Sequence, residues 1–204
     1  VPYFVNFWPL TPHKPISVPR NFVDDGIDFQ LDTERGRMMA MLYQVDRDIG
    51  RIIQVLIDQG LFENTLILIS SDNGGLASNR HPNAALRGSK STLFEGGLAV
   101  PLIAHWPASI PAQSQNESLV MSYDLLPTLV DFNQPSDDAL AQLHNRIDGR
   151  SKADAFLSTT TLPHEPVLWE ISGSPTRSPD GRADRNLAFR KGAYKLIKIR
   201  GRNE

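Results

Sequence analysis

Two adjacent side chains, Asp72 and Asn73, could bind a hard metal ion. They precede Gly74 and Gly75, so a carboxylate and an amide oxygen share one glycine-rich turn. Ca²⁺ and Mg²⁺ prefer oxygen ligands of this kind, although Ca²⁺ takes roughly 6–8 of them. Asp, Asn and Gly are also the commonest residues of ordinary turns. The tetrapeptide alone therefore leaves a metal site and a simple turn both open.

A second polar segment, residues 86–97, could bind a tetrahedral oxyanion. It contains Arg87 and Lys90, several hydroxyl side chains, and three glycines. Cations and exposed backbone N–H groups are the donors that hold such an anion. The segment is not a P-loop, because the Gly-x-x-x-x-Gly-Lys-Ser/Thr spacing is absent. Taken alone, it also fits an ordinary solvated basic loop.

His13 is a third candidate. It lies in the proline-rich segment 9–15, directly after an aromatic and β-branched stretch at residues 3–8 that predicts a strand. A stiff loop behind a strand is a suitable place for a positioned acid or base. An exposed histidine without a catalytic role is the alternative.

The elements around these residues predict an α/β arrangement. Apolar residues recur at three- and four-residue steps over 33–59, and Gly60 follows as a C-terminal cap, which indicates a helix. The continuous apolar run at 66–70 predicts a strand buried on both faces. Because ligands gather at the carboxyl ends of strands in such sheets, we expect Asp72 and Asn73 there, with their oxygens turned toward a common point.

Further elements are expected downstream. Residues 98–105 predict a strand in which Pro101 marks a bulge or an edge. Residues 122–132 predict a helix with Ser122 or Asp124 as its N-cap. The last part of the chain predicts a strand at 167–171 and a hairpin of 187–191 and 194–199 that turns at Gly192.

Composition narrows the classes of function. The chain has 204 residues and a formal net charge of -2, which gives no electrostatic reason to expect nucleic acid. It has no cysteine, so disulfides, thiolate metal sites and a cysteine nucleophile are excluded within it. No apolar run approaches the roughly 20 residues of a membrane helix. The start at Val1, inside a predicted strand, suggests a fragment or a processed product.

Three motifs, taken in order, resemble those of the sulfatase family of the alkaline-phosphatase superfamily. They are Pro-His-x-Pro at 12–15, Ser-Asp-Asn-Gly-Gly at 71–75, and Leu-Arg-Gly-x-Lys-x-x-x-x-Glu-Gly-Gly-x-x-x-Pro at 86–101. Weaker similarities lie at 103–107, 124–129, 147–151 and 189–196. The resemblance extends over nearly the whole chain, and the third motif is its most specific part.

The resemblance implies roles for single residues. Asp72 and Asn73 match a pair of Ca²⁺ ligands, with Mg²⁺ or another divalent cation as the alternative. Lys90 matches the lysine that grips the sulfate and helps to neutralise the leaving oxygen. His13 matches a histidine that protonates or steadies the leaving group. Arg87 and Glu95 look like structural partners of the loop, and His81 would at most contact substrate.

The resemblance also implies what this sequence lacks. The family's nucleophile is a formylglycine made within a Cys/Ser-x-Pro-x-Arg motif, and no such motif is present. The nearest echo, Ser174-Pro175-Thr176-Arg177, is mis-spaced and too far downstream. We therefore expect formylglycine, and the other half of the Ca²⁺ site, in an upstream segment, so that this chain alone would be inactive.

The implied fold is α/β: part of an alkaline-phosphatase-like mixed sheet flanked by helices. Residues 1–160 would belong to the catalytic domain, and residues 161–204 would form a small antiparallel β subdomain. The expected substrate is a small sulfate ester or a sulfated glycan, and the implied location is periplasmic, secreted or lysosomal. Alternatives are a phosphonate or phosphodiester hydrolase of the same superfamily, or a non-catalytic fragment or binding module.

Overall fold

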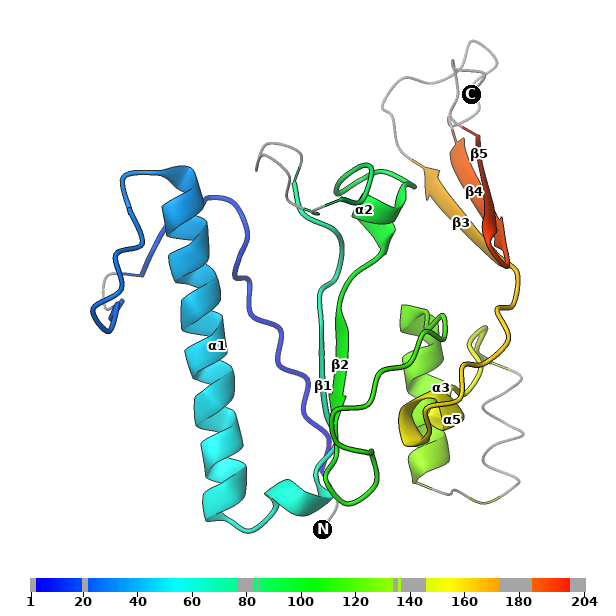
Figure 1. Cartoon of the computed structure of the whole chain (residues 1–204), viewed down its shortest axis with the longest axis horizontal. Coiled ribbons are helices and arrows are strands. Elements are labelled where there is room, and N and C mark those ends of the chain that lie inside the picture. The colour runs from blue at the N-terminus through cyan, green and yellow to red at the C-terminus, as the bar shows by residue number, and fades with distance from the viewer. Residues whose placement is uncertain are drawn as a thin grey trace. The chain divides into compact units, whose positions relative to one another are not determined.

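The computed structural model describes residues 3–19, 22–76, 83, 85–133, 136, 146–172 and 185–198 (Figure 1). The chain divides into two compact units, Val1–Thr65 and Leu66–Glu204. The predicted boundary between residues 160 and 161 stays a prediction. The elements in chain order are α1 (Glu34–Asp58), η1 (Phe62–Asn64), β1 (Ile67–Ser70), α2 (Glu95–Leu98), β2 (Leu102–His105), η2 (Ser122–Asp124), α3 (Leu125–Phe132), α5 (Ala153–Leu157), β3 (Val167–Ser172), β4 (Arg185–Lys191) and β5 (Tyr194–Lys198).

The first unit is built on the long helix α1. The helix begins where the Thr33 side chain accepts a hydrogen bond from the N–H of Gly36 at 2.9 Å. It ends at Asp58, and Gly60 follows with a left-handed φ of 65° and an N–H that donates to Ile57 O at 2.9 Å. Both ends satisfy backbone groups that a helix terminus leaves unpaired. The helix predicted over 33–59 and its glycine cap are confirmed.

A cluster of three aromatic rings packs the loop before α1 onto this helix. The ring centroid of Phe29 lies 5.5 Å from that of Phe22 and 5.3 Å from that of Tyr43. The Tyr43 hydroxyl donates to Asp25 Oδ2 at 2.5 Å, and Arg47 pairs with the same oxygen at 3.0 Å. The hydrogen bond to the Asp25 carboxylate raises the pKa of Tyr43 above its ordinary value. These contacts fix the path of residues 22–33.

The strand predicted at residues 3–8 is wrong. Residues 3–8 pair with no strand in the part of the chain that the structure describes. A strand needs hydrogen bonds to a neighbour, and no strand lies among the described residues of the first unit. The Tyr3 hydroxyl instead forms a hydrogen bond with Thr65 Oγ1 at 2.9 Å.

The second unit begins with the strands β1 and β2, which pair antiparallel from Ile67 opposite His105 to Ser70 opposite Leu102. The β1 side chains are half-buried, and Ser70 is exposed, so the prediction of a strand buried on both faces is wrong. Strand β1 has a single neighbour, β2, among the described strands. Strand β2 starts directly after the proline at 101, as expected for a residue that cannot donate to a ladder.

The start of the predicted strand 98–105 is helical instead, because Leu98 belongs to the single turn α2. Helix α3 follows η2 as predicted, with Asp124 at its N-cap position. The Asp124 carboxylate is buried and accepts from the N–H groups of Met121 and Arg150, each at 3.0 Å. The residue therefore ties segment 146–152 to the start of α3.

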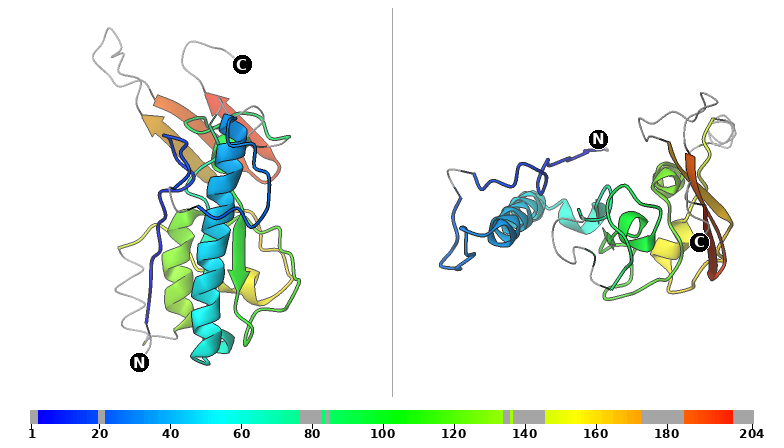
Figure 2. Two further views of the ribbon diagram at one scale, coloured as in Figure 1. Left: turned by 90° about the vertical axis from the view of Figure 1, so that its left-hand side faces the viewer. Right: turned by 90° about the horizontal axis from the view of Figure 1, so that it is seen from above.

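Three antiparallel strands in the order β3-β4-β5 form the carboxyl-terminal sheet (Figure 2). The β4–β5 hairpin pairs Lys191 with Tyr194, and the turn begins at Gly192 with a φ of 58°. Glycine at this position accepts the left-handed conformation that a tight hairpin needs. The predicted hairpin is confirmed.

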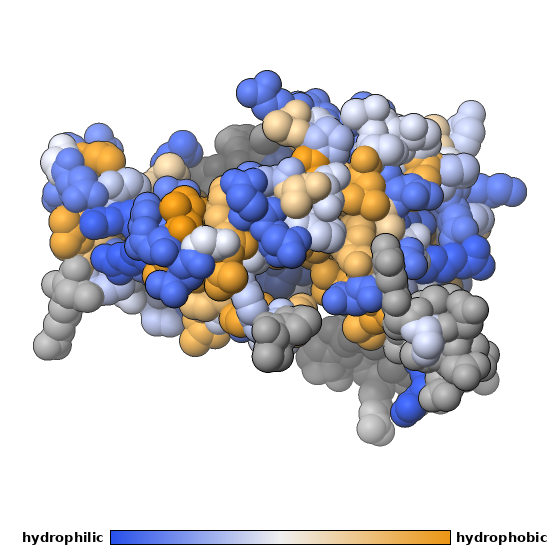
Figure 3. Space-filling model, turned by 90° about the horizontal axis from the view of Figure 1, so that it is seen from below, coloured by the Kyte–Doolittle hydropathy of each residue, from blue (hydrophilic) through white to orange (hydrophobic). Residues whose placement is uncertain are grey.

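Few hydrophobic side chains are fully buried among the described residues. In the second unit they include Leu93, Ala155, Phe156, Val167 and Ala188. Many large apolar side chains reach the surface, where they alternate with hydrophilic ones (Figure 3).

Candidate functional site

Asp72 and Asn73 lie just beyond the carboxyl end of β1, as predicted. Asp72 is exposed and Asn73 is half-buried. The Ser71 hydroxyl donates to Asn73 O at 3.0 Å and holds the turn. Within the described residues, neither the Asp72 carboxylate nor the Asn73 amide takes part in a hydrogen bond or ion pair, so both oxygens can still accept a ligand. Whether these oxygens share one point stays a prediction.

Two backbone hydrogen bonds join this turn to the cationic segment. The N–H of Gly74 donates to Gly97 O at 3.1 Å, and the N–H of Lys90 donates to Gly75 O at 2.9 Å. The segments 71–76 and 87–98 are together named the loop junction. Because backbone groups make both bonds, the structure brings the Asp72–Asn73 turn and Lys90 onto adjacent loops.

Glycines allow this close approach. A Cβ atom on Gly74 would overlap Gly96 O, and a Cβ atom on Gly96 would overlap Gly88 O. Gly96 also donates to Arg87 O at 2.7 Å. A larger residue at position 74 would push the two loops apart, and one at position 96 would disturb the fold of the loop that carries Lys90.

Lys90 sits between two residues with left-handed backbone, Gly88 at φ 89° and Ser91 at φ 69°. The left-handed backbone of Ser91, which is not a glycine, costs conformational free energy, and the surrounding hydrogen bonds must offset this cost. The Thr92 hydroxyl supplies part of that support, since it donates to Ser89 O at 2.7 Å and accepts from the Ser89 N–H at 3.1 Å. The Lys90 side chain is half-buried.

Asn83 is a site-building residue that the sequence reasoning missed. Its Oδ1 accepts from the N–H of Gly75 at 2.8 Å, and its Nδ2 donates to Gly88 O at 2.9 Å. One amide therefore bridges the two loops. The only signal in the sequence was a polar residue of the right length between two glycine-rich motifs.

Arg87 and Glu95 each contact another side chain of the second unit. The Arg87 guanidinium carbon lies 4.1 Å from the centroid of the Phe94 ring. Glu95 Oε1 accepts from Lys195 Nζ at 2.6 Å, although the two residues are 100 positions apart. Lys195 was not singled out from the sequence.

His13 is exposed and belongs to the first unit. Its Nδ1 lies 2.8 Å from Lys14 O. A carbonyl oxygen can only accept, so Nδ1 is the donor in this contact. The convergence of His13 with Lys90 stays a prediction.

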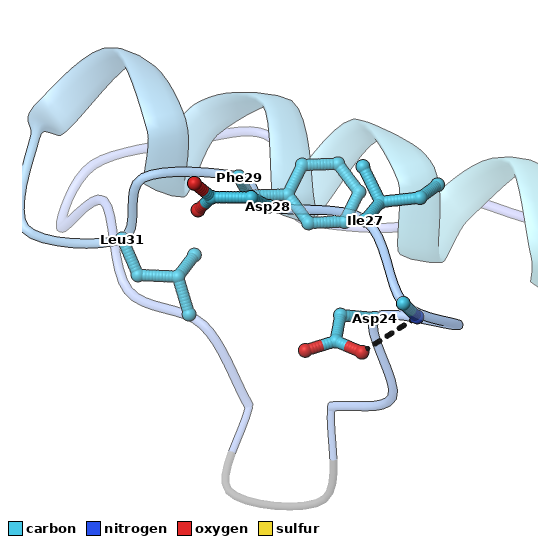
Figure 4. Close-up of a pocket in the computed structure, with 6 residues that line it drawn as sticks. Asp24, Ile27, Asp28, Phe29 and Leu31 are labelled. Carbon is cyan, nitrogen blue, oxygen red and sulfur yellow. Dashed lines mark hydrogen bonds between the residues drawn. The ribbon is translucent and has the colours of Figure 1, made fainter.

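A hollow in the first unit is lined by residues of the segment 24–31 (Figure 4). Asp24 Oδ1 accepts from the N–H of Gly26 at 2.9 Å, and Asp28 Oδ1 accepts from the N–H of Gln30 at 2.9 Å. Each carboxylate thus closes its own turn, which is the ordinary structural use of Asp in loops.

Three further observations concern metal-binding groups, membrane-spanning helices and two candidate segments of the sequence. No group of three or more His, Cys, Asp or Glu side chains suited to a metal ion occurs among the described residues. No helix in the described part of the chain is long and apolar enough to cross a membrane. His81 and the segment 174–177 lie outside the described residues.

Comparison with known proteins gives matches along most of the chain. A family model described as Sulfatase matches residues 2–133. N-acetylgalactosamine-6-sulfatase of Sus scrofa is 31% identical over 192 residues, which is 85% of this chain and 35% of the relative. Arylsulfatase A of Homo sapiens is 32% identical over 148 residues, 71% of this chain and 28% of the relative. The chain thus spans about a third of the length of these relatives.

Two solved structures resemble this one. Ps i-CgsB in complex with k-i-k-neocarrahexaose gives a TM-score of 0.73 at 24% identity, covering 95% of this chain and 40% of that chain. A protein in complex with its substrate D-glucosamine-2-N,6-O-disulfate gives a TM-score of 0.62 at 25% identity, covering 80% of this chain and 31% of that chain. The expected α/β fold is confirmed.

Proposed function

We propose that this chain, which belongs to the sulfatase family, supplies half of the catalytic centre of a sulfuric-ester hydrolase. In this proposal Asp72 and Asn73 bind Ca²⁺, Lys90 binds the sulfate, and His13 assists the leaving group. The observation that carries the proposal is the pair of backbone hydrogen bonds in the loop junction. It puts oxygen ligands and a cation on neighbouring loops, which suits an anionic substrate held between a metal and a lysine.

The donor set fits a hard divalent cation. The Asp72 carboxylate is exposed and unpaired within the described residues, and the Asn73 amide adds a neutral oxygen. Ca²⁺ accepts both ligand types but takes roughly 6–8 oxygens, so two protein ligands are an incomplete set. When bound, such an ion would stabilise negative charge on the sulfate oxygens. Mg²⁺ is the alternative that the same ligands allow.

Lys90 would contribute a second positive charge. Cleavage of the S–O bond builds negative charge on the bridging oxygen, and a fixed ammonium group stabilises it better than mobile water does. The left-handed residues on both sides of Lys90 and the Thr92 hydrogen bonds support a defined path for the backbone that carries it. This is the preorganisation that charge stabilisation needs.

His13 would act as the acid. Because Nδ1 donates to the Lys14 carbonyl, Nε2 is the atom that would give its proton to the departing alkoxide or phenoxide. The carbonyl also restrains rotation of the ring. This role requires His13 to reach the substrate bound at the loop junction.

The nucleophile is a separate part of the proposal. The chain has no cysteine and no Ser-x-Pro-x-Arg sequence. A charged site without a nucleophile can bind and polarise a sulfate ester but cannot form the covalent intermediate. We therefore expect the 204 residues alone to be inactive, and formylglycine to come from an upstream segment of the whole protein.

We propose a sulfated glycan as the substrate class. The support is that one relative is an N-acetylgalactosamine-6-sulfatase and one structural neighbour holds a disulfated glucosamine as its substrate. A periplasmic, secreted or lysosomal location would give such an enzyme access to these polymers.

The test is ester selectivity of the whole protein in the presence of Ca²⁺. A chromogenic aryl sulfate, the matching phosphate and phosphonate esters, and a set of sulfated monosaccharides would be compared. We expect the sulfate esters to be hydrolysed and the phosphorus esters to react far more slowly. Turnover of phosphorus esters alone would overturn the proposal in favour of a phosphonate or phosphodiester hydrolase.

A further inference from the structure

The loop junction is fastened to the carboxyl-terminal sheet by an ion pair. Lys195 of β5 places its Nζ 2.6 Å from Glu95 Oε1, and 4.9 Å from the centroid of the Trp169 ring on β3. The Lys195 side chain is only 14% exposed, while that of Glu95 is 42% exposed. A lysine that lies across an aromatic ring and ends on a carboxylate has its long side chain restrained at two points.

Glu95 is the first residue of α2, and α2 contacts both loops of the site. Gly96 donates to Arg87 O at 2.7 Å, on the Lys90 side of the junction. Gly97 O accepts from the N–H of Gly74 at 3.1 Å, on the Asp72–Asn73 side. The position of this single turn therefore sets the spacing between the two loops.

The packing makes this turn a stiff connection. Backbone atoms of Gly74, Gly88 and Gly96 approach so closely that a Cβ atom would overlap a carbonyl oxygen at Gly74 and at Gly96. Closely packed backbone atoms pass a displacement to their neighbours with little room to absorb it. If Glu95 loses its anchor, the Lys90 loop and the metal-binding turn should both shift.

We infer that Lys195 is a positioning residue, which holds the turn Glu95–Leu98 and thereby sets Lys90 against the Asp72–Asn73 turn. The expected effect on catalysis rests on the proposed function, whereas the claim that Lys195 holds the turn Glu95–Leu98 does not. A small displacement of charged groups is costly in catalysis, since a misplacement of about 1 Å can lower a rate by about 10²-fold. The carboxyl-terminal sheet thus takes part in the site without touching substrate.

The same ion pair has a simpler interpretation, which is that it only stabilises the sheet. A partly exposed pair contributes little to stability in general. The matched control is the ion pair of Arg150 and Glu165, with 2.8 Å between its charged atoms, which lies in the same unit and involves no residue of the loop junction. A purely stabilising role predicts that breaking either pair leaves amide exchange in the loop junction unchanged.

The experiment uses the whole protein with Lys195→Met, Lys195→Arg, Glu95→Gln and Arg150→Met. Methionine keeps the apolar stem over Trp169 and removes the charge, whereas arginine keeps a donor for the carboxylate. We expect Lys195→Met to lower kcat for a sulfate ester by about tenfold or more with a smaller change in KM. Lys195→Arg should recover most of that loss, and Arg150→Met should stay within about twofold of wild type.

Amide hydrogen exchange gives a readout that does not depend on activity. We expect faster exchange at Gly74, Lys90 and Gly96 in Lys195→Met and unchanged exchange there in Arg150→Met. Should Lys195→Met fail to fold, the isosteric Glu95→Gln takes its place. Unchanged exchange in the loop junction would overturn the inference, whatever the rates. Faster exchange in a protein that hydrolyses no sulfate ester would support the positioning role and reject the proposed function instead.

Discussion

The backbone N–H of Lys90 donates to the carbonyl oxygen of Gly75 at 2.9 Å. This bond attaches the cationic loop to the glycine-rich turn at the residue two positions after Asn73. This bond does not depend on the side chain of either residue. Lys90 can therefore be truncated with the loop path kept, which separates the effect of its charge from the effect of its backbone. The proposed roles of the charged side chains become testable one at a time.

We expect Lys90→Ala to reduce kcat of the whole protein by about 10²-fold or more, the scale for the loss of one oxyanion contact. The backbone bond to Gly75 should survive, so the melting temperature should change little. Initial rates on an aryl sulfate give the measurement. Lys191→Ala is the control, because Lys191 is an exposed lysine at the end of β4. Equal rates for the two variants would show that the Lys90 side chain takes no part in catalysis.

The Asp72 carboxylate gives a prediction for the metal. We expect Asp72→Asn to raise the Ca²⁺ concentration that supports half-maximal activity by at least about tenfold, since the change removes the only charged ligand of the pair. Activity measured against free Ca²⁺ in a chelator buffer provides the curve. Asp154→Asn, at an exposed acid in α5, should leave the curve in place. A Ca²⁺ response that is the same in both variants would argue against metal binding at this turn.

Local signals in the sequence were sufficient to predict those elements whose ends are marked by residues close by in the sequence. The helix Glu34–Asp58 was predictable because its apolar period stops at Gly60, where a left-handed residue is needed. The hairpin around Gly192 was predictable for the same reason. Asp72 and Asn73 could be placed at a strand end because an apolar run leads directly into them.

Features that depend on distant partners could not be predicted. Residues 3–8 have the composition of a strand, but pairing decides whether a strand forms, and composition does not show the partner. The turn Glu95–Leu98 contains two glycines, which have poor helix propensity, and is held by contacts to other loops. The bridge made by Asn83 and the ion pair of Lys195 with Glu95 join segments whose closeness only the fold creates.

Asn116 stands in the sequence Asn-Glu-Ser, which resembles a glycosylation sequon. In the structure its Nδ2 donates to Ser158 O at 3.1 Å and to Thr160 O at 3.0 Å, and its Oδ1 accepts from the N–H of Ser118 at 2.9 Å. We expect Asn116→Asp to lower the free energy of unfolding by about 1–3 kcal/mol, because an acceptor oxygen would then face two carbonyls. Urea denaturation measures the change.

A control for this variant is Asn133→Asp. Asn133 is exposed, and among the described residues its side-chain amide makes one bond, to Leu129 O at 2.7 Å. We expect a loss of stability well below that of Asn116→Asp. If Asn116→Asp is as stable as wild type, the amide does not hold segment 158–160 in place.

The glycine packing of the loop junction gives a stability prediction with an internal control. Gly96→Ala should destabilise the protein by about 1–3 kcal/mol, because its Cβ atom would overlap the carbonyl oxygens of Gly88 and Arg87, which are backbone atoms that cannot rotate away. Gly50→Ala should instead stabilise it by about 0.5–1 kcal/mol. Gly50 lies inside α1 with nothing within 4 Å of the new methyl group, and alanine restricts the unfolded chain.

Urea denaturation of both variants, followed by circular dichroism, would give the two changes in opposite directions. The sulfate-ester rate of Gly96→Ala adds a second measurement at a temperature where the variant is folded. We expect this rate to fall, since the methyl group would displace the carbonyl oxygens of Arg87 and Gly88, which belong to the loop that carries Lys90. A Gly96→Ala variant with wild-type stability and rate would mean that the turn Glu95–Leu98 is not packed against the carbonyl groups of Arg87 and Gly88.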